Sequence, residues 1–197
     1  MDIDQIERLK PMEIEQRSFE IISQEAGDAI PDDERAMIIK RVIHTSADFD
    51  YIQNLCFSEN AVQIAQRALK NGAWIVTDTK MALSGINKKS LQLAGGEAHC
   101  FISDEDVAQA AKEQGTTRAS VCVDKAARLG RPLIYAVGNA PTALIRLYEL
   151  IRQGKFRPEL IMQTDVPYIV AKGRKGGSNV AAAICNALLY QLDGSRK

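Results

Sequence analysis

Short apolar runs alternate with amphipathic segments along nearly the whole chain, and this alternation restricts the fold more than any other feature of the sequence. Runs with the composition of buried strands occupy residues 73–77, 100–102, 132–137, 160–162 and 168–170, and a further strand is expected within 49–55. Apolar residues at helical spacing occupy residues 14–25, 32–43, 59–71, 104–114, 117–129, 141–153 and 178–189. Strands separated by helices form parallel sheets that carry helices on both faces. The sequence therefore predicts an α/β fold, with one three-layer α/β/α domain around a mostly parallel central sheet.

The chain has the length of one domain. Its 197 residues suffice for a buried core, and no internal repeat, low-complexity stretch or linker divides them. We expect a single domain over residues 1–197, with residues 1–11 as an N-terminal extension. The 25 basic and 25 acidic residues cancel, so the whole molecule offers no field that attracts nucleic acid. An anionic ligand would need a local cluster of arginines and lysines.

Targeting segments and cysteine motifs are also missing from the sequence. Residues 1–7 are acidic and lack the basic and apolar regions of a signal peptide, and no apolar run reaches the roughly 20 residues that cross a bilayer. We expect a cytoplasmic protein without membrane contact. Cys56, Cys100, Cys122 and Cys185 form no Cys-x-x-Cys pair, which favours buried small hydrophobic residues over a metal site or a disulfide framework.

His44 is one of two histidines and the first candidate for chemistry. Pro31 and the three acids after it predict a helix that ends close to His44, where the helix dipole favours a protonated imidazole. Arg41 precedes it by three residues, and two hydroxyl residues and a carboxylate follow. Imidazole titrates near neutral pH, so His44 is a candidate proton donor, with a packed or helix-capping histidine as the alternative. His99 lacks such neighbours and is expected to be structural.

A glycine-rich basic segment, residues 172–179, lies between an expected strand and an expected helix. Its three glycines let backbone amides turn toward a ligand, the helix start adds free N–H groups, and Arg174 and Lys175 add positive charge. The segment is a candidate cradle for a carboxylate or a phosphate. It matches neither the phosphate-binding loop of nucleotide hydrolases nor the dinucleotide-binding glycine pattern. A glycine-rich turn with solvated charges is the alternative.

Two polar turns directly follow expected strands, at the strand ends where open α/β sheets bind ligands. One runs from Gly138 to Thr142, and the other is Asp78-Thr79-Lys80. Either turn could instead be a simple helix start, with Pro141 at the first position of one helix and Asp78 as the N-cap of the other.

Six short motifs follow one another along nearly the whole chain. They are Glu15-Gln16-Arg17-Ser18-Phe19, Arg41 to Asp48, Asp78-Thr79-Lys80-Met81 with Gly85-Ile86, Thr117-Arg118-Ala119, Gly138 to Leu144, and Gly173 to Ser178. In this order they resemble the precorrin-8X methylmutase family, also called precorrin isomerases, of cobalamin biosynthesis. Six motifs in the right order are far more specific than any one of them.

The resemblance implies an isomerase that moves a methyl group from C-11 to C-12 in ring C of precorrin-8X or cobalt-precorrin-8, giving hydrogenobyrinate or cobyrinate. It implies His44 as proton donor and acceptor for a [1,5]-sigmatropic shift, which needs no cofactor. Cobalt would be present only if the substrate carried it. The resemblance further implies a homodimer with active sites near the subunit interface, and a tetrapyrrole substrate whose product could be handed directly to the next enzyme of the pathway.

The substrate of this family carries many carboxylates, which gives the cationic and polar positions a purpose in substrate binding. The expected contacts are Arg17, Ser18, Arg41, Thr45, Asp78, Thr79, Arg118, Asn139, Thr142, Arg174, Lys175, Gly176, Gly177 and Ser178. No metal site in the protein itself is expected.

One segment departs from the family pattern. Between residues 160–162 and 166–168, family members have a longer stretch of glycine, valine and small apolar residues, whereas only residues 163–165 stand here. The shortened segment leaves open a non-catalytic protein that binds or carries corrinoids. A second alternative is an unrelated α/β enzyme that acts on a phosphorylated metabolite through the glycine-rich loop.

Overall fold

The computed structural model describes residues 10–161 and 166–194. The helices are α1 (Pro11–Ala26), the 3-10 helix η2 (Gly27–Ala29), α2 (Ala36–Ser46), α3 (Tyr51–Asn54), α4 (Ala61–Lys70), α5 (Lys80–Gly85), α6 (Lys88–Leu93), α7 (Glu105–Gln114), α8 (Arg118–Ala127), α9 (Pro141–Arg152) and α10 (Ser178–Asp193). The strands are β1 (Leu55–Phe57), β2 (Trp74–Thr77), β3 (Ala98–His99), β4 (Leu133–Ala136) and β5 (Ile169–Ala171). The expected shortened segment at 163–165 and most of the expected N-terminal extension lie outside the described residues.

The larger sheet is parallel, as the alternation of strands and helices predicts. Its strand order is β3-β2-β4, and Val76 in the central strand lies opposite His99 on one side and Tyr135 on the other. Isolated parallel bridges at Leu160 and Ile161 extend the pairing from β4 toward the segment that leads into β5. The remaining pair, β1 and β5, is antiparallel. The fold is therefore α/β with a mostly parallel sheet.

Alternate side chains of the central strands face two different hydrophobic cores. Ile75 and Ile134 belong to the core shared with α2, α4 and α10, whereas Val76, Leu133 and Tyr135 belong to the core shared with α8 and α9. A strand whose side chains are buried on both faces reads as a continuous apolar run, which is how these strands look in the sequence. The arrangement produces the three layers that the sequence predicts.

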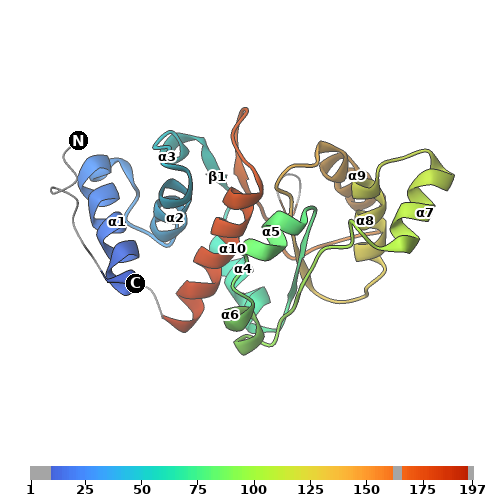
Figure 1. The fold of residues 1–197 in the computed structure, drawn as a ribbon, viewed down its shortest axis with the longest axis horizontal. Helices are drawn as coiled ribbons and strands as arrows, with labels where there is room; N and C mark the ends of the chain where they lie inside the picture. Colours follow the sequence, from blue (N-terminus) through green and yellow to red (C-terminus); the bar gives the residue numbers. More distant parts are fainter. Residues whose placement is uncertain (1–9, 162–165, 195–197) are drawn as a thin grey trace.

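The N-terminal helices add a layer that the sequence pattern does not indicate. Helix α10 packs against both α2 and α5, and α1 packs on the outer side of α2. Figure 1 shows α1 and α2 at one end of the long axis of the molecule and α7, α8 and α9 at the other end. Periodicity reveals that a helix has an apolar face but not which element covers that face.

Three local expectations are wrong. Residues 49–55 form α3 and the start of β1 rather than a strand throughout, and the edge strand β3 lies at residues 98–99 instead of 100–102. Helix α2 begins at Ala36 rather than at residue 32, because the Asp33 carboxylate accepts hydrogen bonds from the backbone and side chain of Arg35 and holds a turn there. Helix α6 was not expected, and α5 was expected only in the alternative in which the Asp78-Thr79-Lys80 turn starts a helix. Within the described residues, no helix is long and apolar enough to cross a membrane.

Candidate active site

His44 lies in the last turn of α2, as the sequence predicts. The helix ends at Ala47, which adopts the left-handed conformation with φ 54° and donates its N–H to the carbonyl of Ile43. The Ser46 hydroxyl donates to the carbonyl of Val42 and helps to close the same turn. The His44 side chain is exposed to solvent.

Helix α1 supplies the partner that orients the imidazole. The Ser18 hydroxyl lies 2.7 Å from His44 Nδ1, and the Phe19 ring meets the imidazole edge to face at 5.7 Å between ring centroids. A hydrogen bond to one ring nitrogen restricts the ring orientation and the position of the proton. Within the described residues His44 Nε2 makes no hydrogen bond, so this nitrogen is available to a ligand.

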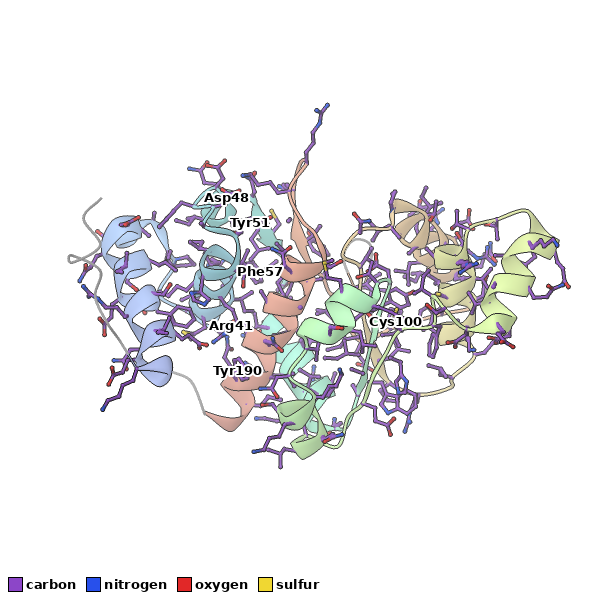
Figure 2. The ribbon with its side chains drawn as sticks, in the orientation of Figure 1. Arg41, Asp48, Tyr51, Phe57, Cys100 and Tyr190 are labelled. Atoms are coloured by element: carbon purple, nitrogen blue, oxygen red, sulfur yellow. The ribbon has the colours of Figure 1, made fainter. Side chains whose placement is uncertain are left out.

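Arg41 is buried one turn before the histidine. Its guanidinium pairs with Glu15 at 2.6 Å and lies between two rings, 5.2 Å from the centroid of Phe19 and 4.5 Å from that of Tyr190. Figure 2 shows Arg41 directed from α2 toward Tyr190 on α10. Only 7% of the side chain is exposed, and its Nε finds no partner among the described groups. Here Arg41 joins α1, α2 and α10, and its expected contact with substrate stays a prediction.

A groove with a volume of about 470 Å³ lies beyond the ends of β4 and β5, where the sequence places the candidate ligand turns. Two turns form it, one leading into α9 and the other into α10. The predicted residues that line the groove are Asn139, Arg174, Lys175, Gly176 and Gly177. Apolar side chains, among them Leu144 and Val180, line the remainder. An apolar floor with a few charged and amide groups suits a flat ligand that carries carboxylates.

Asp78 has a different position from the one expected of a substrate contact. It is 1% exposed, does not line the groove, and its two carboxylate oxygens accept hydrogen bonds from the backbone N–H groups of Gly138, Asn139 and Ala140 at 2.7–2.8 Å. The expected N-cap role of Asp78 is wrong, because the hydroxyl of Thr79 caps α5 instead. Asp78 holds the turn that lines the groove.

The start of α10 is fixed against the same turns. Ser178 Oγ lies 2.7 Å from the Thr79 hydroxyl and is buried, so these two predicted contacts satisfy each other. Gly138 lies so close to this helix start that a Cβ atom there would approach the Ser178 Cα to 2.7 Å. A side chain at position 138 would therefore push α10 away from the end of β4.

A lysine joins the groove to the helix that carries His44. Lys175 Nζ pairs with the carboxylates of Asp48 and Asp50, the latter at 3.0 Å, and lies 5.6 Å over the Tyr51 ring. The hydrogen bond with Lys175 holds the pKa of the Asp48 carboxyl below its usual value, and both carboxylates raise the pKa of Lys175. Figure 2 shows Asp48 and Tyr51 at one end of α2, beside the loop that leads to α10. Asp48 and Asp50 were not predicted as site residues. The signal that could have identified them is in the sequence, where the two acids follow His44 by four and six positions.

Several expected contacts do not line the groove. The Thr117 hydroxyl donates to that of Thr142 at 2.9 Å, and Thr142 borders a separate depression between α8 and α9. Arg118 is exposed at the start of α8, a helix at the opposite end of the molecule from α2 (Figure 1). Arg17 pairs with Glu20 at 3.4 Å on α1, and Thr45 is exposed beside His44. One chain does not bring all the predicted residues into one site.

The second histidine is part of an aromatic stack, in agreement with the structural role that the sequence predicts. His99 lies 4.1 Å from Trp74 and 5.9 Å from Phe101 between ring centroids, and its Nε2 meets Glu97 at 3.1 Å. Arg131 covers the Trp74 ring at 3.9 Å. These contacts hold the imidazole in the stack, and His99 does not line the groove.

The cysteines divide into two classes, which corrects the expectation that all four are buried. Cys122 and Cys185 are buried, and burial raises the pKa of each thiol to about 12, whereas Cys56 and Cys100 are partly exposed. Thiols with so high a pKa are poor nucleophiles. Among the residues that the structure describes, no cluster of His, Cys, Asp and Glu side chains could hold a metal ion.

Known proteins resemble this chain over almost its whole length. A family model described as precorrin-8X methylmutase matches residues 13–164 and 159–191. The cobalt-precorrin-8 methylmutase of Salmonella typhimurium (strain LT2) is 45% identical over 93% of this chain and 96% of its own, and that of Priestia megaterium is 38% identical over 94% and 90%. A solved precorrin-8X methylmutase from Thermus thermophilus superimposes with a TM-score of 0.80 at 34% identity, covering 93% of this chain and 98% of its own.

Proposed function

Because the chain belongs to the precorrin-8X methylmutase family, we propose that His44 is the acid that assists methyl migration and that the groove beyond β4 and β5 binds the substrate. The protein is an isomerase of cobalamin biosynthesis, and its substrate is a tetrapyrrole. One observation carries the assignment of His44. Its Nδ1 is hydrogen bonded to Ser18, while Nε2 of this exposed side chain has no hydrogen-bond partner among the described residues.

The proposed reaction conserves all the atoms of the substrate. The bond from the methyl group to C-11 breaks as the bond to C-12 forms, so neither an oxidant nor a covalent nucleophile is required. A proton from His44 Nε2 to the ring-C nitrogen would make the conjugated system electron-poor and favour the shift, and the proton would then return. The Ser18 hydroxyl would keep the imidazole in one orientation during both transfers.

Carboxylate side chains of the macrocycle would bind at the charged wall of the groove. Arg174 is exposed there and forms no ion pair with a described residue, so its planar guanidinium is free to bind a carboxylate through two hydrogen bonds. The backbone N–H groups of Gly176 and Gly177 precede the first residue of α10, and the N-terminus of a helix favours a negative charge. Asn139 would add a neutral hydrogen-bonding group on the opposite turn.

We further propose that the substrate is the cobalt-containing form and that the protein itself needs no cofactor. Both curated relatives described above are named for cobalt-precorrin-8. The cobalt would arrive in the macrocycle as part of the substrate. The expected cytoplasmic location and a transfer of product to the next enzyme of the pathway stay predictions.

A homodimer would explain why the expected contacts lie at both ends of one chain. Helix α2 with His44 and helix α8 with Arg118 lie at opposite ends of the long axis (Figure 1). If the site lies near a subunit interface, Arg118 of a second copy could bind a carboxylate of the substrate held beside His44. In a dimer with twofold symmetry every contact between the two copies occurs twice, so two such sites would form.

The function is tested by adding purified protein to cobalt-precorrin-8 and following the change in absorption from substrate to product. We expect turnover by the wild type, and a loss of roughly 10²- to 10⁴-fold in turnover with corrinoid binding retained for His44→Ala. His99→Asn is the matched control, because it changes the other histidine without touching the groove. It should retain near-normal turnover.

Other outcomes would favour the alternatives. A stoichiometric spectral shift without turnover by the wild type would point to a corrinoid carrier. Binding of a sugar phosphate or a nucleotide, with no binding of any corrinoid, would point to an unrelated α/β enzyme. Near-normal turnover in His44→Ala would remove His44 as the acid while leaving the family assignment intact.

A further inference from the structure

The two cations of the glycine-rich loop have different surroundings, although they are adjacent in the sequence. Arg174 is exposed and forms no ion pair with a described residue. Lys175 is flanked by two carboxylates, Asp48 and Asp50, and covers the ring of Tyr51. Two carboxylates more than balance the single positive charge of this ammonium group, so a third carboxylate would meet a net negative charge there. Sequence alone places both cations equally well for binding a carboxylate-rich substrate.

The acidic partners of Lys175 are themselves ordered. The Asp48 N–H donates to the Ser46 hydroxyl at 3.3 Å, and one carboxylate oxygen of Asp48 accepts the N–H of Asp50 at 3.0 Å. The other oxygen is the one that meets Lys175. Asp48 and Asp50 thus belong to a formed turn at the end of α2, four to six residues after His44.

The glycine-rich loop that carries Lys175 has unusual backbone freedom. Gly173, Gly176 and Gly177 all adopt positive φ angles, of 74°, 145° and 121°. Glycine loses more conformational freedom than other residues when it is ordered, so such a loop needs contacts to hold one shape. At the start of the loop, the Lys172 N–H donates to the carbonyl of Asn54 at 2.8 Å. Lys175 supplies a second attachment, beyond the first positive-φ glycine.

We propose that Lys175 is a positioning residue: it ties the groove-lining loop to the turn that follows His44 and does not itself bind substrate. This proposal rests on the proposed function, because it assumes that the substrate lies across the groove and reaches His44. The ion pairs are partly exposed, and such pairs add little to global stability. Their effect is on the relative placement of Arg174, the Gly176 and Gly177 amides, and the acid.

Three variants test the proposal in the full-length protein. Lys175→Met removes the charge but keeps a long side chain, Lys175→Arg keeps the charge, and Lys172→Met removes a neighbouring exposed lysine as the matched control. Displacement of reacting groups by about 1 Å costs up to about 100-fold in rate, so we expect Lys175→Met to lower kcat by 10- to 100-fold while KM changes less than about threefold. Lys175→Arg should restore most of kcat, and Lys172→Met should resemble the wild type.

A measurement without substrate separates this proposal from the proposed function. Hydrogen–deuterium exchange should become faster in residues 172–177 and 47–52 of Lys175→Met, and in Asp48→Asn/Asp50→Asn, but not in Lys172→Met. If the wild type shows no turnover and Lys175→Met still exchanges faster, the proposed function fails and the attachment stands. An increase in KM at unchanged kcat for Lys175→Met, as expected for Arg174→Met, would make Lys175 a substrate contact and overturn the proposal. Unchanged exchange in Lys175→Met would overturn it as well.

Discussion

At the end of β2, the buried carboxylate of Asp78 shows how a single side chain builds a ligand groove without facing it. It accepts three backbone hydrogen bonds from the turn before α9. That turn would otherwise have unpaired N–H groups at a buried strand end, which is energetically costly. Asp78 follows a strand and begins a polar turn, so sequence position alone cannot distinguish this role from a ligand contact.

Replacing Asp78 by asparagine tests the role of its charge. The amide keeps the shape, but its NH₂ group then faces a backbone N–H, so we expect the free energy of unfolding to fall by about 1–3 kcal/mol. Urea denaturation measures the change. Asp32→Asn is the control at an exposed carboxylate and should stay within about 0.5 kcal/mol of the wild type. Equal effects of the two substitutions would contradict a structural role for Asp78.

At the scale of elements, α7 depends on a small core and on one lysine. Its buried apolar residues, Val107 and Ala111, form a small cluster with Val121 and Cys122 from α8, and the partly buried Phe101, Ile102 and Ala110 pack against this cluster. Lys125 on α8 pairs with Asp104 at 2.8 Å and Asp106 at 2.7 Å, at the start of α7. The hydrogen bond with Lys125 lowers the pKa of Asp106, and the two carboxylates raise the pKa of Lys125.

These shifts give the attachment of α7 a defined pH dependence. The pKa of Asp106 is lower in the folded state than its ordinary value of 3.8. Its contribution to the stability of the α7 attachment is therefore complete above pH 3.8 and is lost as the pH falls through the lowered pKa. Because the pKa of Lys125 is raised above its ordinary value of 10.5, its contribution to the stability of the same attachment is complete below pH 10.5 and is lost as the pH rises through the raised pKa.

We therefore expect Lys125→Met to accelerate hydrogen–deuterium exchange in α7 at neutral pH, and the difference from wild type to shrink below pH 3.8. The measured quantity is the exchange rate of the α7 amides, corrected for the effect that pH has on exchange in an unstructured chain. Lys112→Met changes an exposed lysine of α7 and should have no comparable effect. A difference of constant size on both sides of pH 3.8 would show that packing rather than charge attaches the helix.

At the scale of the whole molecule, the separation of α2 from α8 makes a definite prediction about assembly. We expect the protein in solution to have twice the mass of the 21.7 kDa chain, as measured by light scattering. We also expect a mixture of His44→Ala and Arg118→Met, each inactive or strongly weakened alone, to regain about a quarter of wild-type activity after the subunits exchange. That gain requires sites built from two copies. A mixture no more active than its components would mean that Arg118 and His44 serve the same chain, or that Arg118 is not part of the site.

Much of the fold can be predicted because its signals are local. The apolar runs of β2 and β4, the proline at the start of α9 and the last turn of α2 around His44 are determined by residues within a few positions of one another. Short elements are less predictable. Helices α5 and α6 have only six residues each, too few to display a helical period, and contacts with α10 stabilise them.

The amino-acid sequence by itself determined the α/β class, the family and the segments from which the site is built, because these depend on local pattern and on the order of motifs. Only the tertiary structure decided how those residues are used. It brings Ser18 to His44, and it pairs Lys175 with Asp48, whereas Arg174 forms no ion pair within the part of the chain that the structure describes. The physical reason is that pairs separated by 26 or 127 positions meet only through the packing of α1, α2 and α10, and the periodicity of one helix carries no information about its neighbours.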